Sequence, residues 1–193
     1  MALPDDPADR YIVIADTFTA LVHGTRDWDR PSPVEEWKAR DVVWHLVDWV
    51  PGLLSVGASV EIPQRDPASN DPVADWRAFE AALRTVVIAK DVTEQPFDHP
   101  QAGSMSLAAA IDMMITPDVF MHSWDLAQAT EQPLALDADF CANLLAGMEG
   151  IDEMLRASGQ YGPRVPVSPD ADAQTRLMAF VGRDPDWASA QHP

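Results

Sequence analysis

The chain has 193 residues, of which 47% are apolar, and it carries a formal net charge of −18 at pH 7. This length predicts one domain with a core that is stable without covalent cross-links. The charge excludes nucleic acid and anionic membrane surfaces as expected partners, because binding to phosphate groups needs clustered Lys and Arg side chains. The single cysteine, Cys141, excludes an internal disulfide and any metal site built from several thiolates.

Signals for export or membrane insertion are missing from the sequence. The first ten residues, MALPDDPADR, are acidic and contain neither a basic region nor an apolar run. No stretch approaches the roughly 18 uninterrupted apolar residues that a transmembrane helix needs. We therefore expect a cytoplasmic protein that does not associate with membranes and that is a monomer or a homodimer.

Two helices are expected in the first quarter of the chain. The first begins near Asp6, which can act as the N-cap for a proline at the first helical position, and it stops at Gly24. The second runs from about Lys38 to Trp49, where Pro51 bends or ends it.

A third and a fourth helix follow. The third begins at Asp71, which can act as the N-cap before a proline at the first helical position. A long loop with two prolines (residues 91–104) follows this helix. The fourth begins at a serine cap, Ser104 or Ser106, and extends to about Thr130. Pro117 lies in its middle and is expected to kink it.

The last part of the chain is expected to hold one long and one short helix. The long helix runs from residue 137 to 157 and is closed by Gly159. A proline-rich connector and a short helix that ends at Gly182 follow. We find no convincing strand, so the pattern predicts an all-α helix bundle over residues 1–160. Residues 161–193 are expected to form the connector and a short helix packed on that bundle.

The most informative feature of the sequence is the pair Asp118 and His122 on the fourth helix. Four residues along an α-helix make about 1.1 turns, so both side chains leave the same face. A carboxylate and an imidazole at this spacing can bind one metal ion. The second helix carries His45 on its own apolar face. Together the three residues predict a three-ligand metal site with open coordination positions, which is typical of catalytic rather than structural metals.

A polar structural network is the alternative interpretation of the same residues. His45 alone is more typical of a satisfied core histidine, and Asp118 with His122 alone could be an ordinary helix-surface pair. All three, however, lie on stripes that otherwise face the core, where an unpaired polar group costs roughly 1–3 kcal/mol. Asp125, one turn after His122, could orient an imidazole as a second-shell acceptor, or it could pair with Arg40.

The remaining candidate residues carry weaker signals. Cys141 lies in an apolar helical pattern and is expected to be inert core packing. Three further histidines are expected to be solvated or to sit at a helix end. One carboxylate could line the same cavity or point to solvent, and three tryptophans could wall a pocket, although core packing is their default role. These residues are His23, His99, His192 and Asp48, with Trp44, Trp49 and Trp124.

At these residues the sequence resembles a known family. The segments EEWKARDVVWHL, DVFMHSWDLAQAT and GPRVPVSPDADAQTRLMAFVGRDP look like the DinB/YfiT-like metal-binding proteins, in the branch of the N-terminal domain of mycothiol-dependent maleylpyruvate isomerase. The resemblance spans about residues 11–187. It implies a four-helix bundle with up-down-down-up topology and a divalent metal, usually zinc or nickel, held by His45, Asp118 and His122. A set of one aspartate and two histidines would also suit ferrous iron.

The resemblance also implies a function. It suggests a metal-dependent thiol transferase or isomerase in which the metal activates a low-molecular-weight thiol, such as mycothiol, toward an electrophilic substrate. Two features depart from the family pattern: Lys38 stands where relatives often carry a Ser or Thr cap, and only one short helix is expected where the isomerase has a separate C-terminal domain. A non-catalytic module that binds a small molecule at the same metal is the alternative function.

Overall fold

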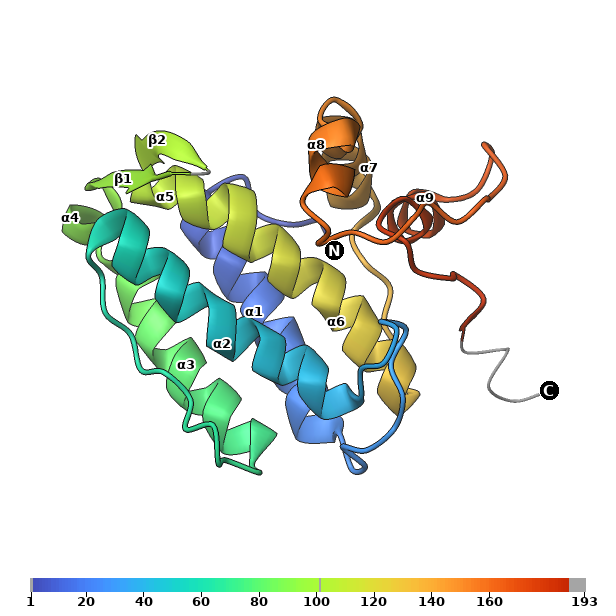
Figure 1. Cartoon of the computed structure of the whole chain (residues 1–193), viewed down its shortest axis with the longest axis horizontal. Coiled ribbons are helices and arrows are strands. Elements are labelled where there is room, and N and C mark those ends of the chain that lie inside the picture. Colours follow the sequence, from blue (N-terminus) through green and yellow to red (C-terminus); the bar gives the residue numbers. More distant parts are fainter. Residues whose placement is uncertain (1, 101, 188–193) are drawn as a thin grey trace.

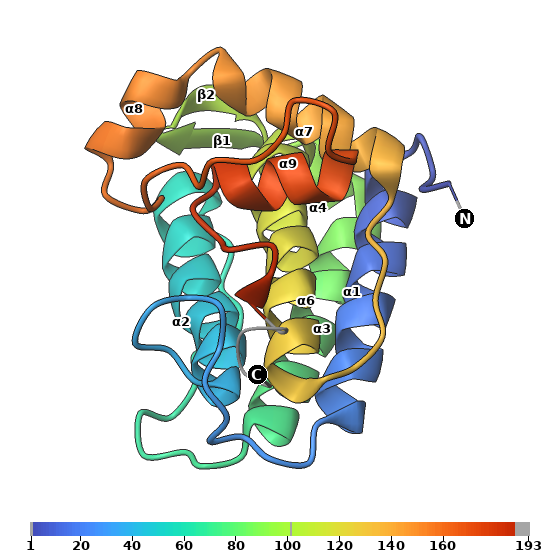
Figure 2. The ribbon, with the colours of Figure 1, turned by 90° about the vertical axis from the view of Figure 1, so that its right-hand side faces the viewer.

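The structure is a computed structural model that describes residues 2–100 and 102–187, and helices dominate this part of the chain. α1 and α2 each pack against both α3 and α6. The helices lie side by side, with α1 and α6 running in one direction and α2 and α3 in the other (Figures 1 and 2). The expected mostly helical fold is confirmed. The long elements are α1 (Pro7–Gly24), α2 (Ala39–Ala58), α3 (Pro72–Ile88) and a continuous run of α5 (Leu107–Ala110), η1 (Ile111–Ile115) and α6 (Thr116–Thr130).

The helix starts follow the local signals in the sequence. The Asp6 carboxylate accepts hydrogen bonds from two backbone N–H groups of the first turn of α1, and Asp71 does the same for one N–H of α3. In α2 the cap is of a different kind. The carboxylate of Asp41 accepts a hydrogen bond of 2.8 Å from the backbone N–H of Lys38. An acidic side chain in the first turn thus satisfies the N-cap backbone where no Ser or Thr is present.

Two prolines lie within the long helical segments. Pro51 does not end α2, which continues through it to Ala58. Val50 and Pro51 are buried, so packing outweighs the missing hydrogen bond. Pro117 lies just after the π-helix η1, which supplies a wider turn where the regular hydrogen-bond pattern is interrupted. The extra residue in that turn offsets the following helix by about 100° and so sets the face from which Asp118 projects.

The segment expected to be a long loop contains regular structure. It forms the short helix α4 (Lys90–Thr93) and an antiparallel hairpin of β1 (Pro96–His99) and β2 (Gly103–Ser106). The expectation that no strand is present was therefore wrong. The strands have four residues each and only Phe97 is fully buried, so they lack the alternation by which a strand is recognised in a sequence. The hairpin ends at Ser106, whose hydroxyl caps α5.

The C-terminal part lies across the long helices as a separate layer (Figure 2). It consists of α7 (Ala138–Glu149), α8 (Asp152–Ala157), a connector and α9 (Ala173–Phe180). α7 packs against α9, and the ring of Phe140 on α7 meets Phe120 on α6 edge to face at 4.8 Å. Residues 161–187 are called the C-terminal segment below. No helix in the described ranges is long and apolar enough to cross a membrane.

The packing of α2 on the hairpin leads to a first prediction. A Cβ added at Gly57 would lie 2.0 Å from the ring of Phe97, which is fully buried and cannot move aside. We expect Gly57→Ala to destabilise the protein by about 1–3 kcal/mol through overpacking. Urea unfolding followed by circular dichroism measures this change.

Gly52 provides the matched control on the same helix. Nothing lies within 4 Å of a Cβ added there, so Gly52→Ala should stabilise the protein by up to about 1 kcal/mol through helix propensity. Equal effects of the two substitutions would contradict the tight contact between α2 and the hairpin.

Candidate metal centre

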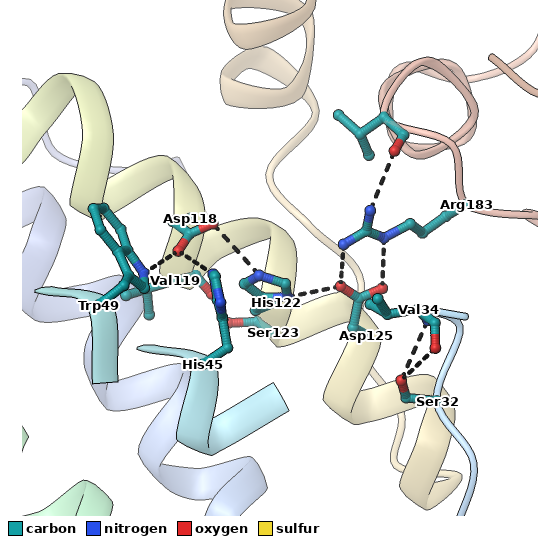
Figure 3. A network of polar contacts seen from close by, with 11 residues as sticks. Ser32, Val34, His45, Trp49, Asp118, Val119, His122, Ser123, Asp125 and Arg183 are labelled. Atoms are coloured by element: carbon teal, nitrogen blue, oxygen red, sulfur yellow. Dashed lines mark hydrogen bonds and ion pairs between the residues drawn. The ribbon is translucent and has the colours of Figure 1, made fainter. Parts of the chain in front are cut away.

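α2 and α6 pack together, and this contact brings the three predicted ligands to one point. Nε2 of His45 lies 3.3 Å from Oδ2 of Asp118, and Nε2 of His122 lies 3.4 Å from Oδ1 of the same carboxylate (Figure 3). The three ligand atoms all lie within 4.8 Å of one another. The structure thus brings together the residues that the sequence predicts as a metal site.

The spacing of these atoms fits a common cation. Four metal–ligand bonds of about 2.1 Å in tetrahedral arrangement separate neighbouring ligand atoms by about 3.4 Å. The two imidazole–carboxylate distances are close to this value, although they end on different oxygens of Asp118 and the three ligand atoms spread over as much as 4.8 Å. A set of two imidazoles and one carboxylate suits zinc, nickel or ferrous iron.

Direct hydrogen bonding accounts for the same contacts less well. A charge-assisted N–H···O bond is about 2.7–2.9 Å long, which the contacts of Asp118 with both histidines exceed. The neighbouring contact between His122 Nδ1 and Asp125 is 2.8 Å long, which falls within the range of a charge-assisted hydrogen bond. Asp125 is thus a hydrogen-bond partner of His122, whereas Asp118 lies 3.3 Å and 3.4 Å from the ring nitrogens of His45 and His122.

Asp118 is held as a carboxylate by its neighbours. Burial by itself raises the pKa of Asp118, but the neighbouring imidazole of His122, then His45 and the indole of Trp49, outweigh burial and leave that pKa below its usual value. The indole Nε1–H of Trp49 donates to Oδ2 of Asp118 at 2.9 Å. Trp49 is one turn after His45 on α2, so the same helix face supplies one ligand and orients another.

His122 is fixed from its opposite side. Its Nδ1 contacts Oδ2 of Asp125, which is completely buried. If Nδ1–H donates to this carboxylate, the lone pair of Nε2 points toward Asp118 and is available to a cation. The prediction that Asp125 orients an imidazole agrees with this contact, whereas the alternative partner Arg40 pairs with Asp29 instead.

The charge of Asp125 is balanced by Arg183, which follows α9. Nε and Nη2 of Arg183 contact the two oxygens of Asp125 at 3.2 Å and 3.0 Å. Burial raises the pKa of Asp125, but the Arg183 charge and the His122 contact more than offset this and keep that pKa low. A chain of contacts therefore leads from the C-terminal segment through Asp125 to His122 (Figure 3).

Aromatic rings close part of the site and one side is open. The ring of Trp37 lies 5.1 Å from that of His45 and stacks on His122 at 5.8 Å. Trp49 lies 6.1 Å from His45 on another side. The side chain of His45 is nevertheless 32% exposed, whereas that of His122 is 6% exposed. A ligand from solvent therefore reaches the cluster most directly past His45.

Several other candidates from the sequence lie elsewhere. The indole of Trp44 donates to Asp75, Asp48 pairs with Arg65, and Trp124 is buried in the core. His23 lies in the last turn of α1, as expected, and the ring of His99 stacks on that of Phe97. His192 lies outside the described residues.

Sequence reasoning missed two parts of the site. Arg183 is 58 residues from Asp125, and nothing local in the sequence marks the pairing. Trp37 lies in the loop before α2, where no periodic pattern assigns it a face.

The fold and the cluster define a mainly helical protein with two histidines and one aspartate converging between α2 and α6. No protein-family model matches the chain, and no solved structure matches it. It is similar to two proteins of Mycobacterium tuberculosis, "Uncharacterized protein MT0763" of strain CDC 1551 / Oshkosh and "Uncharacterized protein Rv0738" of strain ATCC 25618 / H37Rv. Each is 29% identical over 183 residues, which cover 92% of this chain and 98% of the relative.

The converging donors predict the metal content of purified protein. Untagged protein should carry about one divalent cation per chain by elemental analysis, and Asp118→Ala and His122→Ala should each lose it, because two remaining donors do not hold the ion. His23→Ala, which removes an exposed histidine at the end of α1, serves as the control and should retain it. Full occupancy in His122→Ala would rule out the ligand assignment.

The indole contact with Asp118 predicts a smaller effect. Trp49→Phe keeps most of the ring but removes the donor to Oδ2, so zinc affinity should fall about tenfold, as is typical when a group that orients a ligand is lost. Competition with a chromophoric chelator measures the affinity. Trp44→Phe removes an indole donor from the same helix without touching the cluster and should leave zinc affinity unchanged. A similar decrease in both variants would show that only helix packing was affected.

Proposed function

We propose that the protein is a metal-dependent thiol transferase or isomerase. Its three ligands, His45, Asp118 and His122, would hold a divalent cation, and a low-molecular-weight thiol would be the second reactant. The observation that carries this proposal is the convergence of three donor atoms beside an open side. A closed structural site would instead surround the ion with four protein ligands.

We also propose that the four long helical segments form a four-helix bundle of the DinB/YfiT type. Two features support this: the mutual packing of α1, α3, α2 and α6, and the run of α1 and α6 against α2 and α3 (Figure 2). The long connection between α2 and α3 lets these two helices run in the same direction. A topology of this kind sets two ligand-bearing helices, α2 and α6, next to each other.

A bound cation would activate the thiol for attack on the second substrate. When bound, a divalent cation lowers the pKa of a coordinated thiol and so supplies a thiolate at neutral pH. The sulfur would form a bond to an electrophilic carbon while the bond from that carbon to a leaving group breaks. The thiol proton would pass to solvent on the open side at His45. Trp37 and Trp49 would restrict water around the other sides of the cluster.

The chain itself does not supply the thiol. Cys141 is completely buried in α7, and burial raises the pKa of its thiol to about 12. A thiol in that state is a poor nucleophile at neutral pH. The reacting sulfur would therefore come from a separate molecule, for which mycothiol is the expectation from the sequence.

A two-substrate assay tests the proposal. Zinc-loaded or nickel-loaded protein should consume an aryl halide such as 1-chloro-2,4-dinitrobenzene, followed by absorbance, only when mycothiol or a simpler thiol is present. His122→Ala should reduce the rate to that of the uncatalysed reaction, whereas Cys141→Ala should retain full activity. Turnover without any added thiol, or activity that survives in His122→Ala, would contradict the proposal.

A non-catalytic binding module is the second candidate, because the half-open cluster could equally present a cation to a ligand that is not changed. In that case a ligand at a thousandfold excess over its Kd would stabilise the protein by about 4 kcal/mol without turnover. Thermal unfolding with thiol alone, measured beside the rate assay, distinguishes the two functions.

A further inference from the structure

We propose that Arg183 is a positioning residue for the candidate metal centre: it holds Asp125 from the C-terminal segment, and Asp125 in turn holds the ring of His122. This inference rests on the proposed metal site. It gives a specific role to a segment that contributes no ligand.

The contacts along this path leave little freedom at either step. Arg183 engages both oxygens of Asp125, and its third guanidinium nitrogen donates to the carbonyl of Val181 at 3.2 Å. A two-point contact of this kind fixes the plane of the carboxylate as well as its position. The same carboxylate lies 2.8 Å from Nδ1 of His122 and would accept a hydrogen bond from it. The orientation of the carboxylate therefore determines the orientation of the imidazole ring.

Arg183 is itself placed by the backbone before it. Gly182 adopts φ +90° and packs on Gly162, where an added Cβ would lie 2.9 Å from the backbone of Gly162. The backbone N–H of Arg183 donates to the carbonyl of Met178 at 2.9 Å, which closes the end of α9. The position of the guanidinium thus follows from the crossing of two glycines and from the end of α9.

Burial makes the arginine necessary for this arrangement. The side chain of Asp125 is 0% exposed and that of Arg183 is 13% exposed, so water cannot replace the guanidinium as partner. Without Arg183, the carboxylate would lose the two contacts that fix its plane and would turn toward other donors, because an unpaired buried charge is strongly unfavourable. This change would weaken its hold on His122 Nδ1.

Arg156 offers a matched control for the test. Its guanidinium also holds the C-terminal segment, by donating to the carbonyls of Phe180 and Gly162, but it has no contact with Asp125. Arg156→Met should therefore weaken the docking of the segment, while the two contacts of Arg183 with Asp125 and its contact with Val181 do not involve Arg156 and should keep the pair in place. Arg183→Met removes the pair itself.

The first measurement is zinc affinity, determined by chelator competition on full-length protein. Arg183→Met should bind zinc about 10–100-fold more weakly than wild type, and Arg156→Met should stay close to wild type. An equal loss in both variants, or no loss in Arg183→Met, would overturn the proposal. Should Arg183→Met fail to fold, Arg183→Lys replaces it, because a single-point contact should still weaken zinc binding. Wild-type affinity in Arg183→Lys would then overturn it.

The second measurement does not depend on metal. In metal-free protein, the hydrogen-bonded Nδ1 proton of His122 should give a downfield proton NMR signal, identified by its absence in His122→Ala. Arg183→Met should lose this signal and Arg156→Met should keep it, whereas a merely structural role for Arg183 would leave it unchanged. If wild-type protein binds no zinc, the proposed function fails, and this signal alone decides whether Arg183 positions His122.

Discussion

Two carboxylates on one helix, the half-buried Asp118 and the fully buried Asp125, are the constraint on which the site depends. Each would be unfavourable in the core without a partner of opposite charge or several donors. The chain satisfies them from different directions: α2 brings His45 and Trp49 to Asp118, and the C-terminal segment brings Arg183 to Asp125. The packing of three separate parts of the chain is therefore tied to the electrostatics of α6.

His122 lies between these two carboxylates and connects them. Its Nδ1 is engaged by Asp125 at hydrogen-bonding distance, and its Nε2 faces Asp118 at the longer distance expected for two ligands of one ion. The π-helix η1, directly before α6, sets the rotation of both side chains relative to α2. Backbone geometry far from any loop thus determines which groups meet.

The parts of this arrangement that could be predicted are those with a local cause. The caps at Asp6 and Asp71, and the shared face of Asp118 and His122, follow from spacing within one helix. The meeting of His45 with that pair was predictable only because all three lie on core-facing stripes. The hairpin was missed because its strands are short, and Arg183 was missed because its contact with Asp125 joins distant parts of the chain.

The positive charge of Arg183, in the C-terminal segment, affects which ligand a metal-loaded site would favour. Arg183 and Asp125 cancel, so the three candidate ligands present the single negative charge of Asp118. A divalent cation would leave one positive charge, which favours an anion such as a thiolate as the next ligand. Without the arginine the loaded site would be neutral, and a thiolate would place an uncompensated charge in a largely buried cluster.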